Sequence, residues 1–150
     1  MLQVVQRNRE AYLPLLLLAD PSEEMVRRYL LDGELYAWLT EEDETVGVLH
    51  VVEIDPGVVE IKNIAVRELY QGQGHGKKLL DEVIKRLRER GANEVVVRTG
   101  NSSIGNLAFY QKIGFRMMNI EHDYFLNEYQ TPIFENGIRC RDRVHLALPL

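Results

Sequence analysis

The chain has 150 residues, a length that predicts one domain, residues 1–150, able to bury a core without disulfides or metals. Its composition is that of an ordinary soluble protein, with 45% hydrophobic residues, 27% charged residues and a formal net charge of −5. This acidic balance, without a dense basic stripe, argues against a nucleic-acid partner. The single cysteine, Cys140, excludes an intrachain disulfide and is typical of a reducing compartment.

Neither a signal peptide nor a membrane span is expected. Arg7, Arg9 and Glu10 interrupt the N-terminal segment where a signal peptide would be apolar. The longest apolar run, residues 13–19, includes Pro14 and is far shorter than the ~20 residues that a membrane span needs. We therefore expect a cytoplasmic protein that does not bind a membrane.

The apolar pattern predicts an α/β domain in which several strands precede the longest helix. It indicates, in chain order, a strand over 2–6, helices over 12–19 and 20–31, and strands over 35–40, 46–54 and 58–66. Polar turns join the last three strands, which makes them antiparallel neighbours. No repeat, linker or low-complexity segment divides the chain.

After residue 66 the period changes from that of a strand to that of a helix. Apolar residues between Leu79 and Leu87 recur every three or four positions, as on one face of an amphipathic helix over 76–90. The pattern is completed by a strand over 95–97, a helix capped by residues 101–103 and ending at Lys112, and strands over 115–120 and 143–148. Residues 121–141 follow no clear pattern, and so long a connection is often functional.

Residues 71–77, Gln-Gly-Gln-Gly-His-Gly-Lys, stand directly before the longest helix. Because glycine lacks a Cβ atom, such a backbone can adopt positive φ angles and approach a ligand closely. The free N–H groups of the helix's first turn, and the positive end of its dipole, favour an anion. We therefore interpret the loop as a main-chain grip for the pyrophosphate of a cofactor, with these candidate residues: Gln71, Gly72, Gln73, Gly74, His75, Gly76 and Lys77.

Other glycine-loop motifs fit less well. A P-loop needs four residues before its Gly-Lys and a Ser or Thr after it, whereas three residues separate Gly72 from Gly76 and Lys78 follows Lys77. A dinucleotide-binding fingerprint follows its strand directly and has an acid at the end of the next strand. Here residues 67–70 intervene and that acid is missing, which disfavours an NAD(P)-dependent oxidoreductase. A plain glycine turn stays open as an alternative.

Two segments resemble motifs of the GCN5-related N-acetyltransferase (GNAT) superfamily. Residues 66–80 resemble its motif A, because Gln71, Gly74 and Gly76 fill the pattern Gln/Arg-x-x-Gly-x-Gly/Ala. Residues 108–115 resemble its motif B, in which a helix ends in Tyr-x-x-x-Gly-Phe before a strand. The long C-terminal connection is similar to that of an uncharacterised bacterial subgroup.

The resemblance implies a mixed, mostly antiparallel central sheet of about seven strands, flanked by about four helices and splayed at an acetyl-CoA site. It implies direct transfer of an acetyl group from acetyl-CoA, without a metal or an acyl-enzyme, to a primary amine of a small molecule or peptide. The acceptor is expected to bind against the first helices and residues 121–141, and the chain to form a homodimer. A non-catalytic acyl-CoA-binding sensor on the same fold is the alternative.

The resemblance also implies cofactor contacts outside the loop. The strand before the loop would pair its main chain with the pantetheine arm, aided by a bulge or splay, through Ile64, Ala65 and Val66. Asn101 and Asn106 are further candidates, although Ser103 stands where the family often has an asparagine. Asn101 has an alternative role as a cap of the following helix.

Two residues are implied to act on protons. Tyr110 matches the family's usual acid, and its phenol suits protonation of a leaving thiolate. Glu60 matches a catalytic glutamate of several members and would take the amine's proton directly or through water. Strand periodicity places Glu60 and Lys62 on one face with Ile64 and Val66, so a plain cross-strand ion pair with Lys62 is the alternative for Glu60. A core aromatic is the alternative for Tyr110.

Other reactive side chains give weaker signals. Cys140 lies between two arginines that would lower the pKa of its thiol, although a structural thiol is the simpler interpretation. The spacing of the four histidines does not resemble a zinc site. His122 is interpreted as an exposed turn residue, or else as part of the acceptor pocket.

Overall fold

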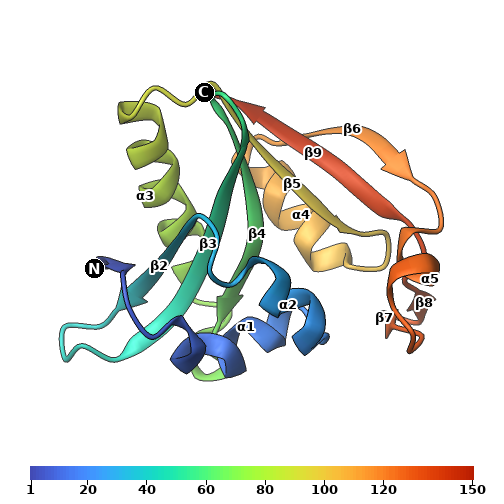
Figure 1. Cartoon of the computed structure of the whole chain (residues 1–150), viewed down its shortest axis with the longest axis horizontal. Coiled ribbons are helices and arrows are strands. Elements are labelled where there is room, and N and C mark those ends of the chain that lie inside the picture. The colour runs from blue at the N-terminus through green and yellow to red at the C-terminus, as the bar shows by residue number, and fades with distance from the viewer. The chain divides into compact units, whose positions relative to one another are not determined.

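The computed structural model describes all residues, 1–150, and divides into two compact units, residues 1–93 and 94–150 (Figure 1). The first unit contains nine elements: β1 (Leu2–Val5), η1 (Arg9–Tyr12), α1 (Leu13–Ala19), α2 (Glu23–Tyr29), β2 (Glu34–Leu39), β3 (Thr45–Asp55), β4 (Val58–Val66), η2 (Glu68–Tyr70) and α3 (His75–Glu89). The strands β1 to β4 pair as sequential antiparallel neighbours. The elements predicted from the sequence of this unit are all confirmed, with bounds shifted by a few residues.

Local chemistry explains where α2 begins and ends. Ser22 is its N-cap, and the Ser22 hydroxyl accepts a hydrogen bond from the Met25 N–H at 3.2 Å. Beyond the helix, Gly33 has a φ of +54°, and a Cβ atom there would lie 2.0 Å from the Val51 carbonyl oxygen. Only glycine fits this turn, which returns the chain directly into β2.

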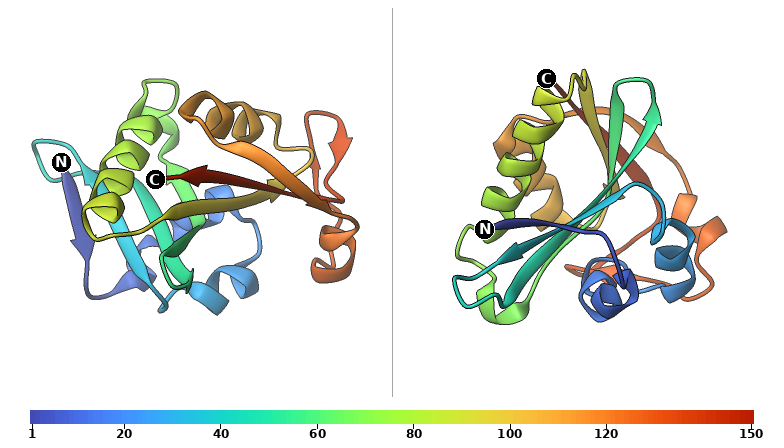
Figure 2. Two further views of the ribbon diagram at one scale, coloured as in Figure 1. Left: turned by 90° about the horizontal axis from the view of Figure 1, so that it is seen from above. Right: turned by 60° about the vertical axis from the view of Figure 1, so that its left-hand side comes forward.

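The sheet of the first unit is covered on both faces (Figure 2, right). Helices α1 and α2 pack on one face through an apolar cluster that includes Leu16, Val26, Leu35 and Ala65. Helix α3 packs on the other face, where the Arg86 guanidinium lies 5.9 Å from the centre of the Tyr36 ring. Leu35 and Tyr36 are both fully buried, so β2 has no solvent-facing side at this point.

One extra residue interrupts the ladder between β3 and β4. His50 of β3 pairs with Asn63 of β4. The next residue of β3, Val51, pairs with Ile61, which leaves Lys62 unpaired as a β-bulge. The predicted irregularity in this strand is therefore present, four residues before the end of β4 at Val66.

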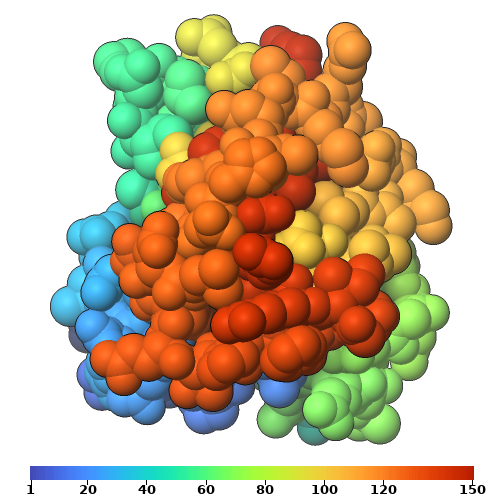
Figure 3. Space-filling view, turned by 90° about the vertical axis from the view of Figure 1, so that its right-hand side faces the viewer, coloured from blue at the N-terminus to red at the C-terminus, as the bar shows by residue number.

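The second unit contains β5 (Glu94–Gly100), α4 (Ile104–Ile113), β6 (Arg116–Glu121), α5 (Tyr124–Glu128), β7 (Phe134–Glu135), β8 (Ile138–Arg139) and β9 (Arg143–Pro149). Strand β9 pairs antiparallel with both β5 and β6. The segment between β6 and β9, orange to red in Figure 3, lies on the surface of this unit. No helix of the chain is long and apolar enough to cross a membrane.

The connection between β6 and β9 is more regular than the sequence analysis expected. It forms α5 and the hairpin β7–β8, so the chain has five α-helices rather than about four. The hairpin turn is Asn136-Gly137, and both residues have positive φ angles, +55° and +73°. This dipeptide is the usual signal of a two-residue hairpin turn, and it was visible in the sequence.

Candidate functional site

The glycine loop leads into α3 with its backbone open to solvent. Gly72 and Gly74 have left-handed φ angles of +75° and +82°, and Gly74 is the N-cap of α3. No heavy atom lies within 4 Å of the position that a Cβ atom would take at either glycine. The backbone therefore leaves space in which a ligand can approach the main chain.

The first turn of α3 supplies hydrogen-bond donors to this space. The first i to i−4 bond of the helix runs from the Lys78 N–H to the Gly74 carbonyl, at 3.1 Å. The N–H groups of His75, Gly76 and Lys77 precede this bond and have no partner within the helix. They stand at the positive end of a helix of 15 residues, an arrangement that binds phosphate groups.

The side chains of the loop bind the protein itself. The Gln71 Nε2 donates to the Val66 carbonyl at 2.8 Å, and the Gln73 Nε2 donates to the Leu69 carbonyl at 3.3 Å. The Lys77 ammonium pairs with Asp81, one turn further along α3, at 2.7 Å. These contacts brace the loop, so its main chain is the candidate group for binding an anion.

The strand before the loop presents two faces. Ala65 is 5% exposed and belongs to the apolar cluster under α1 and α2. Ile64 and Val66, its neighbours along the strand, are half-buried and point to the opposite face. Pairing of this main chain with the pantetheine arm stays a prediction.

Glu60 is nearly inaccessible, with 3% of its surface exposed, and forms an ion pair of 2.5 Å with the Lys62 ammonium. Both residues belong to β4, so the predicted cross-strand pair is a pair within one strand. The two partners differ in exposure, because 30% of the Lys62 side chain reaches solvent. Without the Lys62 cation, a buried carboxylate of this kind would lower the stability of the fold.

The predicted common face of Glu60 and Ile64 is wrong. Glu60 pairs with Val52 across the ladder, and Ile64 pairs with Leu49. Leu49 and Val52 lie three positions apart on β3, and such residues point to opposite faces of a sheet. The bulge at Lys62 causes this reversal, because it inserts a residue into the alternation.

Two polar residues to which the sequence analysis gave no role, Asn63 and His50, lie on the Glu60 face. The Asn63 amide donates to the Leu16 carbonyl and to the Tyr29 hydroxyl, both at 2.9 Å. His50 is fully buried, and its Nε2 lies 2.7 Å from the Asp32 carbonyl, to which it donates. Sequence alone gave one signal: each of these polar side chains interrupts an apolar run in β3 or β4.

Burial sets the protonation of this group. It lowers the pKa of His50 from 6.5 to about 4, so the imidazole is neutral at pH 7. Burial also raises the pKa of Tyr29 to about 12, so its hydroxyl stays protonated. The Tyr29 and His50 rings are 5.0 Å apart. Helices α1 and α2 are thus tied to β3 and β4 by neutral polar contacts.

Tyr110 lies in the last turn of α4 and is 3% exposed. Its ring makes edge-to-face contacts with Phe109 and Phe115, at 5.2 Å and 5.4 Å. Burial raises the pKa of the phenol, which therefore carries its proton at neutral pH, as an acid must. These ring contacts also serve the core role that the sequence analysis gave as the alternative.

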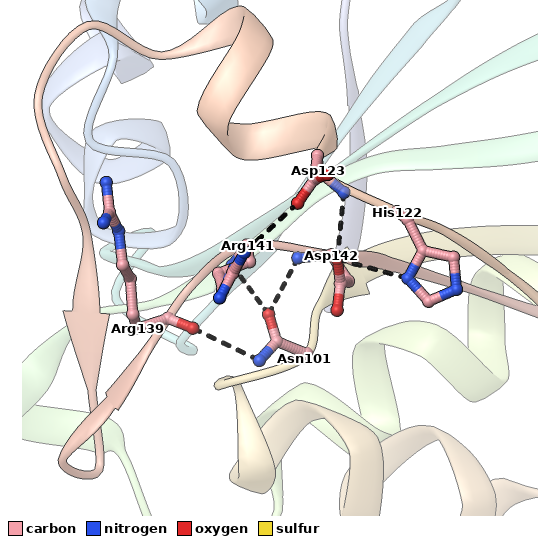
Figure 4. Close-up of polar contacts among 6 residues, drawn as sticks. All are labelled: Asn101, His122, Asp123, Arg139, Arg141 and Asp142. Atoms are coloured by element: carbon pink, nitrogen blue, oxygen red, sulfur yellow. Dashed lines mark hydrogen bonds and ion pairs between the residues drawn. The ribbon is translucent and has the colours of Figure 1, made fainter.

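Asn101 fastens the C-terminal connection to the end of β5 (Figure 4). Its Oδ1 accepts from the N–H groups of Arg141 and Asp142, at 2.8 Å and 3.0 Å. Its Nδ2 donates to the Arg139 carbonyl at 3.2 Å. The capping alternative for Asn101 is wrong, because Ser103 is the N-cap of α4 and no side chain caps that helix.

The remaining candidates of the second unit are less constrained. Asn106 is exposed on α4 and makes no side-chain hydrogen bond within the chain, so its cofactor contact stays a prediction. Cys140 is 3% exposed, and burial raises the pKa of its thiol, the opposite of what a nucleophile needs. The His122 side chain is 77% exposed, with its Nδ1 3.6 Å from Asp142, as expected of an exposed turn.

Comparisons with known proteins agree on one family. The family model described as acetyltransferase (GNAT) family matches residues 4–115. The N-acetyltransferase YvbK of Bacillus subtilis (strain 168), itself uncharacterized, is 49% identical over 146 residues, which cover 97% of this chain and 92% of that one. A solved B. subtilis acetyltransferase in complex with CoA is 45% identical, with a TM-score of 0.92 and coverage of 99% of this chain and 97% of that chain.

A second solved structure is still closer in shape. A GNAT family acetyltransferase from Elizabethkingia anophelis with acetyl-CoA bound has a TM-score of 0.94 and 41% identity, covering 100% of this chain and 97% of that chain. The chain belongs to the acetyltransferase (GNAT) family. Its α/β fold, with seven strands in the main sheet, is the fold that the sequence resemblance implied.

Proposed function

We propose that the protein transfers an acetyl group from acetyl-CoA to a primary amine of a small molecule or peptide. The N-terminus of α3 carries this proposal: Gly72 and Gly74 open the backbone, and the amides of His75, Gly76 and Lys77 have no helical partner. This arrangement suits the pyrophosphate of CoA. Two solved relatives, at 45% and 41% identity, have CoA or acetyl-CoA bound, which supports the same ligand here.

The proposed reaction is direct. Acetyl-CoA supplies an acetyl thioester, the amine nitrogen forms the new amide bond, and the carbon–sulfur bond breaks. Glu60 takes the proton that the amine loses, directly or through water, and Tyr110 gives a proton to the leaving sulfur. The buried, protonated phenol of Tyr110 supports its role as the acid. The role of Glu60 rests on the family resemblance, and its ion pair with Lys62 matches the structural alternative.

The acceptor is proposed to meet the first helices and the connection between β6 and β9. Helices α1 and α2 are fixed to β4 by Asn63, and the connection is fixed to β5 by Asn101. Each of these regions is therefore fastened within its own unit.

We also propose a cytoplasmic homodimer. Strand β6 pairs only with β9 in its unit, and its exposed edge carries Met117, Met118 and Ile120 with 51%, 66% and 55% of their surfaces exposed. An apolar edge strand of this kind favours pairing with a second copy. Light scattering of the purified chain measures the mass directly; a monomer at all concentrations contradicts the dimer.

Release of free thiol from acetyl-CoA tests the transfer reaction. The purified chain is incubated with acetyl-CoA and a panel of amines, peptides and aminoglycosides, and the products are identified by mass spectrometry. We expect thiol release that depends on one class of amine and an acetylated product of that amine. Tight binding of acetyl-CoA with no turnover on any acceptor would instead identify a sensor.

A further inference from the structure

The connection between β6 and β9 encloses a hollow of its own. The hollow has a volume of about 200 Å³ and lies between α5, the loop that follows it and the end of β8. Its walls include Phe125, Tyr129, Thr131, Ile133, Arg139 and Cys140. The lining is mixed, with aromatic rings, two hydroxyls and one guanidinium, so it suits a ligand with an apolar body and a polar end.

The end of β5 fits closely against two of these walls. A Cβ atom at Gly100 would lie 2.5 Å from the Cys140 sulfur and 3.5 Å from Phe125. Glycine at this position therefore allows both side chains to pack directly on the strand. The Cys140 N–H donates to the Ile133 carbonyl at 2.7 Å, and the Phe125 N–H to the Arg141 carbonyl at 3.0 Å. With the Asn101 contacts, these bonds fasten the segments that line the hollow to one another and to the end of β5.

The charges around the hollow leave one cation available. Arg141 lies 3.6 Å from Asp123, and Arg143 forms an ion pair of 2.9 Å with Glu121. The Arg139 guanidinium forms no ion pair, and Figure 4 shows it pointing away from the Asn101 contacts, to which Arg139 gives only its carbonyl. An exposed guanidinium is a binding group for a carboxylate, and Arg139 is one of the residues that line the hollow.

We propose that this hollow, the Arg139 pocket, binds the part of the acceptor amine that carries an apolar group and a carboxylate. This inference rests on the proposed function and names the substrate class: amines that also carry an acid, such as aromatic or branched amino acids. A volume of about 200 Å³ is below the roughly 300–1,000 Å³ of pockets that hold a whole small molecule, so the hollow holds one end of a substrate rather than all of it. A single guanidinium matches a monoanionic carboxylate better than a dianionic phosphate.

Acceptor kinetics test the proposal. Phenylalanine, tyrosine and leucine are compared with their carboxamides as acceptors for the wild type, Arg139→Gln and Arg116→Gln. Arg116 is an exposed arginine of the same unit outside the pocket, so Arg116→Gln matches the change in charge. We expect Arg139→Gln to raise the KM for the acids about tenfold, with kcat and the KM of the carboxamides unchanged. A preference for carboxamides, or equal effects of the two variants, overturns the proposal.

Binding of phenylacetate, which has no amine, separates this inference from the proposed function. Chemical-shift titration of the labelled chain without acetyl-CoA is expected to show saturable binding near Phe125 and Arg139, weakened about tenfold by Arg139→Gln and not by Arg116→Gln. This result supports the pocket even if no amine is acetylated. In that case only the proposed function is contradicted. Absence of saturable binding, or equal binding by Arg139→Gln, overturns the pocket even where acetyl transfer is found.

Discussion

The glycine loop and the connection between β6 and β9 are organised in opposite ways. The loop, residues 71–77, presents main-chain N–H groups, and its side chains only brace it. The connection, residues 122–142, is held by side chains, above all Asn101 and Arg143. A main-chain site leaves a local signal in the spacing of its glycines, and here the second motif, residues 108–115, made that signal specific. A side-chain site depends on residues that are distant in the chain, so local spacing does not reveal it.

Among substitutions in the second unit, we expect Tyr110→Phe to have the largest effect on catalysis. If its phenol protonates the leaving sulfur, Tyr110→Phe lowers kcat about 100-fold while the Kd of acetyl-CoA stays unchanged. The substitution keeps the ring and its contacts with Phe109 and Phe115, so we expect the fold to be unchanged and any loss of kcat to come from the missing hydroxyl. Single-turnover kinetics and calorimetry measure the two quantities. An unchanged kcat would reduce Tyr110 to a core aromatic.

His50 tests whether the first unit also depends on a buried side chain. Because burial lowers its pKa to about 4, the folded state keeps His50 neutral while the unfolded chain takes up a proton near its ordinary value of 6.5. The free energy of unfolding should therefore fall as the pH drops from 6.5 to about 4, by roughly 3 kcal/mol in all.

Urea unfolding at a series of pH values measures this slope. Other groups titrate in the same range, so the control is the difference between the wild type and His50→Asn. That difference should shrink as the pH falls through the window. A constant difference from pH 7 to pH 4 would show that His50 titrates alike in the folded and unfolded chains.

Asn101 tests the dependence of the connection on one side chain. Asn101→Ala removes three hydrogen bonds to residues 139–142, at about 1 kcal/mol or less for each partly exposed bond, so we expect a loss of about 2 kcal/mol. Hydrogen exchange should accelerate over residues 122–142 and not over α3. Asn106→Ala is the matched control, because Asn106 is an exposed helix residue without such bonds. Equal exchange in the two variants would refute the fastening role.

Lys77 should have the smallest effect, if the main chain is the grip. Its ammonium is already paired with Asp81 on the exposed side of α3. Lys77→Met is therefore expected to change the Kd of CoA by less than about threefold, as is usual for an exposed charge. A titration of CoA at two salt concentrations checks this. A large, salt-dependent loss of CoA affinity would show that the Lys77 charge, rather than the main-chain amides, contributes most of the binding energy.

Sequence reasoning reached the elements of the fold because their signals are local. The spacing from Leu79 to Leu87 in α3 repeats within a few residues, and burial in the structure follows it. Burial in β4 alternates from Ile61 to Val66. The family resemblance implied a bulge or splay in this strand, but the position of the bulge at Lys62 escaped prediction, because an inserted residue leaves no mark in an alternating pattern. It reversed the face of Glu60 relative to Ile64.

The connection between β6 and β9 was misread for two reasons. One signal was overlooked, since Asn136-Gly137 is a hairpin turn between two short apolar-containing segments. The other information is not local: the hydrogen bonds of Asn101 join residues 38 to 41 positions apart. No pattern within residues 121–141 could show that Asn101 fastens them, or that Arg139 is left without an acidic partner.

A calorimetric titration of CoA into two glycine variants tests the main-chain grip most directly. Gly74 and Gly91 both have left-handed φ angles, +82° and +86°, and no heavy atom lies within 4 Å of either Cβ position. Gly74→Ala and Gly91→Ala should therefore lose similar stability, about 1 kcal/mol each, from backbone strain. Only Gly74→Ala should weaken CoA binding, by at least about tenfold, because its methyl group enters the space before the α3 amides. Equal CoA affinity in the two variants would contradict the account.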